Sequence, residues 1–384
     1  MLRAKKIKSV AVLGAGSGGC AIVAELHKRG IEVRLFSRSQ HRLAPLRKNG
    51  GLAYTGACGE GFAPIHTITA NIQEAVDGVD LIIISTPTNA HTWFAEALKP
   101  HFQDGQTVML NPGHTGGGLA FIHALRAAGF NGVVDVCETI TLTHGARMVA
   151  PATVRVFLVM ENVMFAAFPG RHTDSLLPQV QELFPGLIRA TNVLETALLN
   201  LNALEHPPGM LLNAGWVEFT GGNFCFYSEG ITPAVGRLIQ ALDDERLAVV
   251  REFKRKAGIY LAEMSFIEYF FQIGLTSEAA RKSGDVYQAL QDSEPNRLVR
   301  APASLKHRYM DEDVGFGLVP MYYLGQLVGI SMPVTYAVIK LSSLIRGVDY
   351  LNQGRSLSSM GLDTVPLDKL KAFLEGGYVA NSTT

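Results

Sequence analysis

The stretch "VAVLGAGSGGCAIVAELHKRGIEVRLF" (residues 10–36) decides the fold expected for the first part of the chain. A short apolar run, Val10–Leu13, precedes glycines spaced GxGxxG, and helix-forming residues follow over Cys20–Arg29. Gly30 stands where a helix C-cap glycine belongs, and Ile31–Phe36 is a second apolar run. Strand, glycine-rich turn, helix and strand in this order predict a βαβ unit that binds a dinucleotide.

The glycines of this turn have separate physical roles. Gly14 permits a tight turn, Gly16 lets the backbone approach a pyrophosphate, and Gly19 lets helix and strand pack closely. The helix N-terminus then faces the phosphate charge. With residues from the ends of later strands, the candidate cofactor-binding set is Gly14, Gly16, Ser17, Gly18, Gly19, Ser37, Arg38, Thr86 and Glu138.

The end of the second strand bears on which nucleotide binds. NAD-binding folds usually carry an Asp or Glu there, bonded to the ribose 2′-hydroxyl. This chain has Ser37 and Arg38, with Arg42 nearby. A missing carboxylate and an added guanidinium suit a 2′-phosphate, so NADP(H) is favoured over NAD. The alternative, that Arg38 stacks on adenine or faces solvent, stays open.

Further short apolar runs continue the alternation of strand and helix. They include Leu81–Ser85, Thr107–Leu110 and the start of "GVVDVCETITLTHGAR" (residues 132–147). In open α/β sheets ligands bind at the carboxyl ends of the strands. By position, that rim contains Thr86, Asn111, His114, Glu138, Thr139 and Thr141. Each alone is equally compatible with a turn or capping role.

Length and composition limit the classes of protein. With 384 residues, 47% of them apolar, the chain is long enough for two domains. Lys plus Arg equals Asp plus Glu, at 34 each, which argues against a nucleic-acid or membrane-surface partner. The four cysteines are far apart and form no CxxC pair, so we expect reduced thiols, no metal site and a cytoplasmic protein. The uncharged run 318–339 contains prolines and glycines, which favours a buried helix pair over a membrane span.

Beyond about Pro185 the alternation stops and helical patterns take over. We therefore expect a Rossmann-like dinucleotide-binding α/β domain over residues 1–186 and an all-α domain over 187–384. Within "NLNALEHPPGMLLNAGW" (residues 200–216), Pro207 predicts the end of a helix, so His206 is expected at a helix C-terminus, which favours a protonated ring. From this segment alone, two interpretations stand: a surface histidine that caps the last carbonyls, or a proton donor in a cleft.

A second polar cluster lies near the C-terminal third of the chain. Arg308 precedes three consecutive acids, residues 311–313, and the turn Gly315–Gly317. Runs of acids usually form a solvated face. Because an apolar segment follows at once, one of these acids is expected to point inward.

At this point the chain resembles the opine dehydrogenases, the octopine/nopaline type that includes carboxyethyl-norvaline dehydrogenase. The resemblance runs through nearly the whole chain. Its most specific segments are the Asn–x–x–x–His–Pro of "NLNALEHPPG" and the Arg–Tyr–x–x–Glu–Asp–Val of "HRYMDEDVGFG". It is also carried by "GAGSGG", "ETITLTHGAR", "FYSEGITPAVGRLIQALDDERLAV" and "DYLNQGRSLSSMGL".

The resemblance implies a Rossmann domain, a helical domain and a cleft between them. It implies reductive condensation of an amino acid's amine with a 2-oxo acid by NAD(P)H, and small-molecule partners. Separately from the resemblance, the long uncharged stretches of the second domain leave a homodimer as an option. The proton-transfer pair would be His206 and Asp313, and Arg308 would bind a substrate carboxylate. The remaining substrate-binding candidates implied by the resemblance are Thr141, His114 and Asn202.

Two places depart from the family pattern. Residues 142–147 read Leu–Thr–His–Gly–Ala–Arg where the family commonly has Leu–Pro–Tyr, and Gly315 replaces a usual proline. Both are expected to line the substrate region. Two other function classes remain: a dehydrogenase of the glycerol-3-phosphate or 2-hydroxy-acid type, and a nucleotide-binding sensor without turnover.

Overall fold

The computed structural model describes residues 6–103 and 105–378, which form two compact units. The first takes the chain up to Gly113, then Gly117–Thr196 and the chain from Ala372 onward. The second takes His114–Gly116 and Ala197–Lys371. The domain boundary expected between residues 186 and 187 stays a prediction. The two units are discontinuous along the chain, and the division nearest to that boundary falls after Thr196.

An eight-stranded sheet forms the core of the first unit. Its order is β12-β11-β8-β7-β6-β1-β2-β5, and all described neighbours run parallel except β8 and β11. The run β5-β2-β1-β6-β7-β8 has the order of a doubly wound dinucleotide-binding sheet. The strands are β1 (Ser9–Leu13), β2 (Glu32–Phe36), β5 (Thr67–Thr69), β6 (Leu81–Ile84), β7 (Gln106–Leu110), β8 (Val134–Thr139), β11 (Val163–Phe168) and β12 (Leu187–Arg189).

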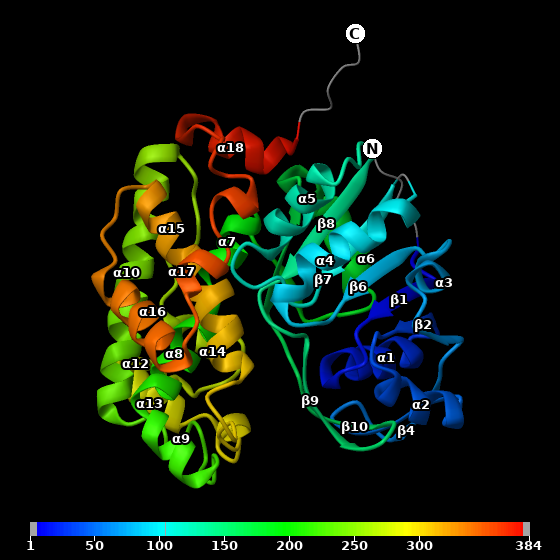
Figure 1. The fold of residues 1–384 in the computed structure, drawn as a ribbon, viewed down its shortest axis with the longest axis horizontal. Helices are drawn as coiled ribbons and strands as arrows, with labels where there is room; N and C mark the ends of the chain where they lie inside the picture. Colours follow the sequence, from blue (N-terminus) through cyan, green and yellow to red (C-terminus); the bar gives the residue numbers. More distant parts are fainter. Residues whose placement is uncertain (1–5, 104, 379–384) are drawn as a thin grey trace. The chain divides into compact units, whose positions relative to one another are not determined.

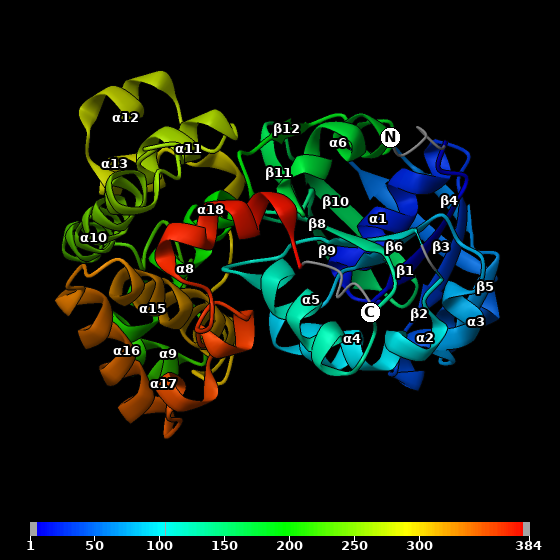
Figure 2. The same ribbon diagram turned by 90° about the horizontal axis from the view of Figure 1, so that it is seen from above.

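Helices cover both faces of this sheet, so its central strands are apolar on both sides. The chain reverses its direction of travel at β1, because β2 pairs with one edge of β1 and β6 with the other. Helix α1 (Ser17–Lys28) therefore lies on one face, and α4 (His91–Leu98) and α5 (Gly117–Ala127) pack together on the other (Figure 2). This double cover explains the short, uninterrupted apolar runs that predicted the strands.

A second, four-stranded sheet packs on the outer side of α1. Its order is β4-β3-β10-β9, and α1 contacts all four strands. Enclosed between two sheets, α1 is buried from Gly19 to Leu26, including the charged Glu25. The strands are β3 (Gly51–Gly56), β4 (Gly61–Pro64), β9 (His144–Ala150) and β10 (Thr153–Val159).

The remaining segments of the first unit are short helices and the returning C-terminal chain. Phe373 and Tyr378 pack against Phe168 of β11, and the Tyr378 hydroxyl lies 3.0 Å from Nδ1 of His123. The helices are α2 (Gln40–Asn49), α3 (Ile72–Val76), η1 (Thr88–Ala90), η2 (Lys99–His101), η3 (Gly170–His172) and α6 (Thr173–Gln181), with α7 (Val193–Leu198) at the division between the units.

Every named element of the second unit is a helix. Helix α8 (Leu201–Leu212) is its centre and contacts α10, α14 and α16 (Figure 1). The others are α9 (Ala214–Thr220), α10 (Pro233–Ala257), α11 (Phe266–Gln272), α12 (Glu278–Ser283), α13 (Val286–Gln291), η4 (Glu294–Asn296), α14 (Arg308–Asp313), the π-helical η5 (Val314–Leu318), α15 (Val319–Leu327), α16 (Pro333–Arg346), α17 (Tyr350–Gln353), η6 (Ser358–Met360) and α18 (Leu367–Gly376), which ends in the first unit.

Two expectations about this region are wrong. The strand pattern does not stop at Pro185, because β12 still adds to the large sheet beside β11. Helix α8 does not end at Pro207; it continues through Pro207 and Pro208 to Leu212. Both prolines are buried, and the packing of α8 offsets the two backbone hydrogen bonds that they remove. None of the described helices is long and apolar enough to cross a bilayer, and the uncharged run is divided between α15 and α16.

Candidate active site

The glycine-rich turn between β1 and α1 has the geometry expected of a phosphate site. Gly14 has φ +129°, and a Cβ there would lie 2.2 Å from the carbonyl oxygen of Ser85 on the neighbouring strand. A Cβ on Gly19 would lie 1.8 Å from the Gly14 carbonyl oxygen, so only glycine fits. Gly16 caps α1 without a side-chain hydrogen bond, and the first turn carries no acid. The N-terminal amides of α1 are thus not capped by a side chain, which suits a pyrophosphate.

Other predicted cofactor residues surround this turn. Ser37 directly follows β2 and is buried, whereas Arg38 is exposed and its guanidinium lies 4.4 Å from the Trp93 ring centroid. Arg42 donates to the Ala15 carbonyl inside the turn, at 3.3 Å. Ser17 Oγ accepts from the amide of Met148. The guanidinium of Arg42 therefore lies beside the glycine-rich turn, and Arg38 stands just after the end of β2.

Two polar side chains at strand ends behave differently. Thr86 follows β6, and its buried Oγ1 has no hydrogen-bond partner, so a cofactor atom would satisfy it. Glu138 of β8 is fully buried and accepts from the Gly118 amide at 2.7 Å and from the Thr196 hydroxyl. Glu138 thus anchors the start of α5, and its direct contact with a cofactor stays a prediction.

The structure brings His206 and Asp313 together inside the second unit. Nδ1 of His206 in α8 lies 2.7 Å from Oδ2 of Asp313, the last residue of α14. Both side chains are buried, and the imidazole stacks on the Tyr309 ring with centroids 3.5 Å apart. The short contact requires that Nδ1 carries the hydrogen and donates it to the carboxylate, which leaves Nε2 free to accept.

A tyrosine and a second carboxyl group continue this chain from the other ring nitrogen. Nε2 of His206 lies 2.9 Å from the Tyr227 hydroxyl and 3.5 Å from Oε1 of Glu205. The same hydroxyl lies 3.3 Å from Oε1 of Glu205, whose Oε2 is buried without a hydrogen-bond partner. Asp313 thus contacts one nitrogen of His206, while Tyr227 and Glu205 both lie near the other nitrogen and near each other.

Burial sets the protonation of these groups. Desolvation lowers the pKa of His206 although the adjacent Asp313 opposes it, so the ring is neutral near pH 7. Desolvation raises the pKa of Glu205 to about 8, so this carboxyl group is protonated at pH 7. The expected helix-end imidazolium is therefore wrong: His206 lies within α8, away from its C-terminal carbonyls, and is poised as a base.

A second polar group in the same unit contains His114, Glu312 and Arg308. Nε2 of His114 lies 3.2 Å from Oε1 of Glu312, and Nη1 of Arg308 lies 3.8 Å from Oε2. Burial works to lower the pKa of His114, but the Glu312 carboxylate outweighs it and raises that pKa above its usual value. His114 also has a left-handed backbone, with φ 56°, as strained functional residues often do.

The acids 311–313 face different surroundings. Glu312 and Asp313 are buried, so two acids point inward rather than one, while Asp311 pairs with Arg346. Asn202 is half-buried on α8, and it is Asn200 whose Nδ2 lies 3.3 Å from Nδ1 of His114. The sequence interpretation missed Glu205, Tyr227, Tyr309 and Asn200, although all four stand within the segments that carried the resemblance.

The first unit holds the remaining predicted residues. Thr141 is half-buried after β8, and Thr139 is buried within that strand. Asn111 bonds the Thr143 hydroxyl at 2.9 Å. His144, within the segment 142–147 that departs from the family pattern, directs its ring to Glu25 of α1.

Sheet order, phosphate turn and buried histidine–carboxylate pair define a Rossmann-fold oxidoreductase with a separate helical unit. Residues 10–165 match the ketopantoate reductase PanE/ApbA family, and residues 189–346 match the family described as NAD/NADP octopine/nopaline dehydrogenase, alpha-helical domain. An opine dehydrogenase from Arthrobacter sp. (strain 1C) is 33% identical over 96% of this chain and 99% of its own length. The chain belongs to the opine dehydrogenase family and is an NAD(P)-dependent oxidoreductase that acts on CH–NH groups.

Two solved structures share the fold. Octopine dehydrogenase with NADH and L-arginine has a TM-score of 0.77 at 20% identity, covering 97% of this chain and 99% of that one. Yersinopine dehydrogenase with NADP+ has a TM-score of 0.70 at 15% identity, covering 96% and 98%. Relatives of this fold thus bind either nicotinamide cofactor.

Proposed function

We propose that the enzyme condenses the amine of an amino acid with a pyruvate-like 2-oxo acid and reduces the resulting imine to an N-(carboxyalkyl)amino acid, and that it also runs the reverse oxidation. The observation that carries the chemistry is the buried His206–Asp313 pair, with Nε2 of a neutral ring as the reactive nitrogen. Family membership supports the reaction type, and the second unit supplies the proton-transfer groups.

The phosphate turn, Thr86 and the arginines fit a nicotinamide dinucleotide, which supplies the hydride. We favour NADPH because no carboxylate ends β2 and because Arg38 and Arg42 lie near the turn, with Arg38 ready to meet a 2′-phosphate. Ser37 would bond the ribose. Relatives with the same fold bind NADH or NADP+, so the fold does not decide between the two cofactors. The preference for NADPH therefore rests on residues of this chain.

His206 moves the protons of the condensation. The neutral ring accepts a proton at Nε2 from the substrate ammonium group, and the freed amine adds to the oxo carbon. The adduct nitrogen passes one proton to the new alkoxide oxygen, and the imidazolium, held by Asp313 at Nδ1, donates its proton to the resulting hydroxyl, which leaves as water. One proton enters and one leaves, so His206 is neutral again when the iminium group is reduced.

Tyr227 and Glu205 hold the resting ring ready for this step. The Tyr227 hydroxyl faces two acceptors, Nε2 of the neutral ring at 2.9 Å and Oε1 of Glu205 at 3.3 Å, and it donates to Nε2 over the shorter contact. When Nε2 gains a proton, it donates to the Tyr227 oxygen instead, and the Tyr227 hydroxyl then donates to Oε1 of Glu205. Tyr227 therefore keeps a hydrogen-bond partner in both protonation states of His206.

Substrate carboxylates require cations. We assign the binding of substrate carboxylates to Arg308, whose guanidinium is partly exposed beside Glu312, and to His114, whose pKa is raised. Asn202 and Thr141 are kept as further substrate contacts, with Thr141 on the 2-oxo acid. A cytoplasmic homodimer is also proposed; exposed apolar side chains on α16, including Leu341 and Leu344, support an interface, and light scattering of the purified protein tests it.

A grid of amino acids against pyruvate, 2-oxoglutarate and glyoxylate, with NADPH and NADH separately, tests the function. We expect cofactor oxidation only when both an amino acid and an oxo acid are present, and faster with NADPH. Oxidation with an oxo acid alone would instead identify a 2-hydroxy-acid dehydrogenase, and cofactor binding without turnover would identify a sensor.

A further inference from the structure

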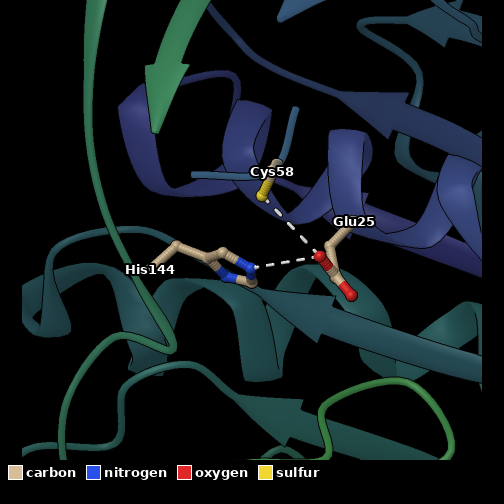
Figure 3. Close-up of side chains that lie close together, drawn as sticks. All are labelled: Glu25, Cys58 and His144. Carbon is tan, nitrogen blue, oxygen red and sulfur yellow. Dashed lines mark hydrogen bonds and ion pairs between the residues drawn. The ribbon is translucent and has the colours of Figure 1, made fainter. Parts of the chain in front are cut away.

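Three chemically distinct side chains meet around α1, outside the groups assigned to catalysis. Glu25 comes from α1, Cys58 from the turn between β3 and β4, and His144 from the start of β9 (Figure 3). All three are buried, and one possible ligand atom from each lies within 4.8 Å of the others. We propose that Glu25, Cys58 and His144 bind one divalent transition-metal ion of the zinc type.

The distances fit such an ion. Oε2 of Glu25 lies 3.7 Å from Sγ of Cys58 and 3.8 Å from Nε2 of His144. Zinc bonds of about 2.0–2.1 Å to nitrogen or oxygen and about 2.3 Å to sulfur place tetrahedral ligand atoms roughly 3.3–3.6 Å apart. Those two pairs need to close by only a few tenths of an ångström. Carboxylate, thiolate and imidazole together favour zinc, or cobalt in its place, over magnesium or calcium.

The imidazole points to a ligand independently of these distances. Nε2 of His144 is buried and has no hydrogen-bond partner, which is costly for a ring nitrogen. Its Nδ1 lies 2.9 Å from the Thr143 hydroxyl, a contact that fixes the ring as metal-bound histidines usually are fixed. A metal ion at Nε2 would satisfy the remaining lone pair.

The charges around Glu25 leave the required oxygen available. Arg29 donates Nε and Nη2 to Oε1, at 2.9 and 2.6 Å, and so orients the carboxylate with Oε2 toward Cys58 and His144. Lys28 lies 3.9 Å from Oε2, but it is partly exposed and screened by solvent. Cysteine binds such an ion as the thiolate. Binding therefore releases the thiol proton, and the ion's two charges are balanced by one thiolate and one carboxylate.

A cavity of about 390 Å³ adjoins the group and is lined by Glu25, Arg29, Thr143 and His144 among others. It offers an entry path and room for a water molecule as the fourth ligand. The spacing of the cysteines in the sequence gives no sign of this site, because its three ligands are far apart along the chain, at positions 25, 58 and 144. Only the packing of the small sheet on α1 brings them together. The ion would fasten β9 and the β3–β4 turn to the helix that begins at the phosphate site.

Cobalt binding to the full-length, tag-free protein after chelator treatment tests the proposal. We expect one Co²⁺ per chain and a thiolate-to-cobalt charge-transfer band in the near ultraviolet. Cys58→Ser should abolish the band, while the matched control Cys225→Ser, in the other unit, should retain it. Glu25→Gln and His144→Gln should weaken binding at least about tenfold, as expected for lost ligands. One equivalent of zinc should raise Tm by several degrees in the parent and not in Cys58→Ser.

NADPH binding, followed by fluorescence, verifies that each variant is folded, since none of the three residues belongs to the proposed cofactor or catalytic set. Absence of the band in the folded parent protein would overturn the proposal. So would a band that survives Cys58→Ser.

Discussion

Asp313→Asn isolates the negative charge beside His206. Asparagine has nearly the shape of aspartate and can keep the bond to Nδ1 by turning its amide oxygen toward the ring. The hydrogen bond from Nδ1 then has an uncharged acceptor. A hydrogen bond to a charged group contributes about 1.5–3 kcal/mol, and about 1.4 kcal/mol is a factor of ten in rate. We therefore expect kcat to fall about 10- to 150-fold.

The pH profile gives the sharper readout. Asp313 is the main group that opposes the lowering of the His206 pKa by burial. Without its charge, that pKa falls further, so the acidic limb of kcat/KM should move toward lower pH. Stopped-flow or steady-state oxidation of NADPH across a pH series measures this, with NADPH binding as the control for folding. An acidic limb that stays in place or moves upward would refute the account of the pair.

Three further predictions concern His206, Arg38 and Glu205. His206→Ala should lower turnover by roughly 10²–10⁴ with cofactor affinity nearly unchanged, and near-normal turnover would contradict its role. Arg38→Ala should raise KM for NADPH about tenfold and leave KM for NADH within about twofold; an equal change for both cofactors would point to adenine stacking instead. The pKa of Glu205 rises from 4.5 to about 8 on folding, so the stability that its protonated form contributes is complete below pH 4.5 and lost as pH rises through 8. Glu205→Gln removes this titration, so the free energy of unfolding of the variant, measured with urea, should fall less between acidic and alkaline pH than that of the parent protein. An identical pH dependence in both proteins would rule out a buried neutral carboxyl group.

Local sequence patterns predicted the elements whose character depends on near neighbours. β1, α1, β2, β6 and β7 all appear close to their expected bounds, because an apolar run between helices and a GxGxxG turn has few alternatives. The second half was predicted as helical for the same reason, and the family and structural matches confirm both parts of the fold.

The errors arose where tertiary packing outweighs a local rule. Proline normally ends a helix, but α8 is the buried centre of its unit, and nine of its twelve residues are buried. Apolar burial of about 1.5–3 kcal/mol per large side chain offsets the roughly 3 kcal/mol that an internal proline costs. Asn202, chosen by motif spacing, stays a prediction, and the residue that contacts His114 is Asn200, directly before the helix start at Leu201. Tyr227 was missed because no spacing rule connects it to His206.

The interleaved path of the chain limits how such enzymes can be recombined. The polypeptide passes from one unit to the other after Gly113, Gly116, Thr196 and Lys371. A chimera with a foreign helical unit therefore needs four junctions, not one, and must keep the segment around Phe373 with its native α/β partner. Changing substrate specificity by point substitution should therefore disturb this fold less than exchanging whole gene segments.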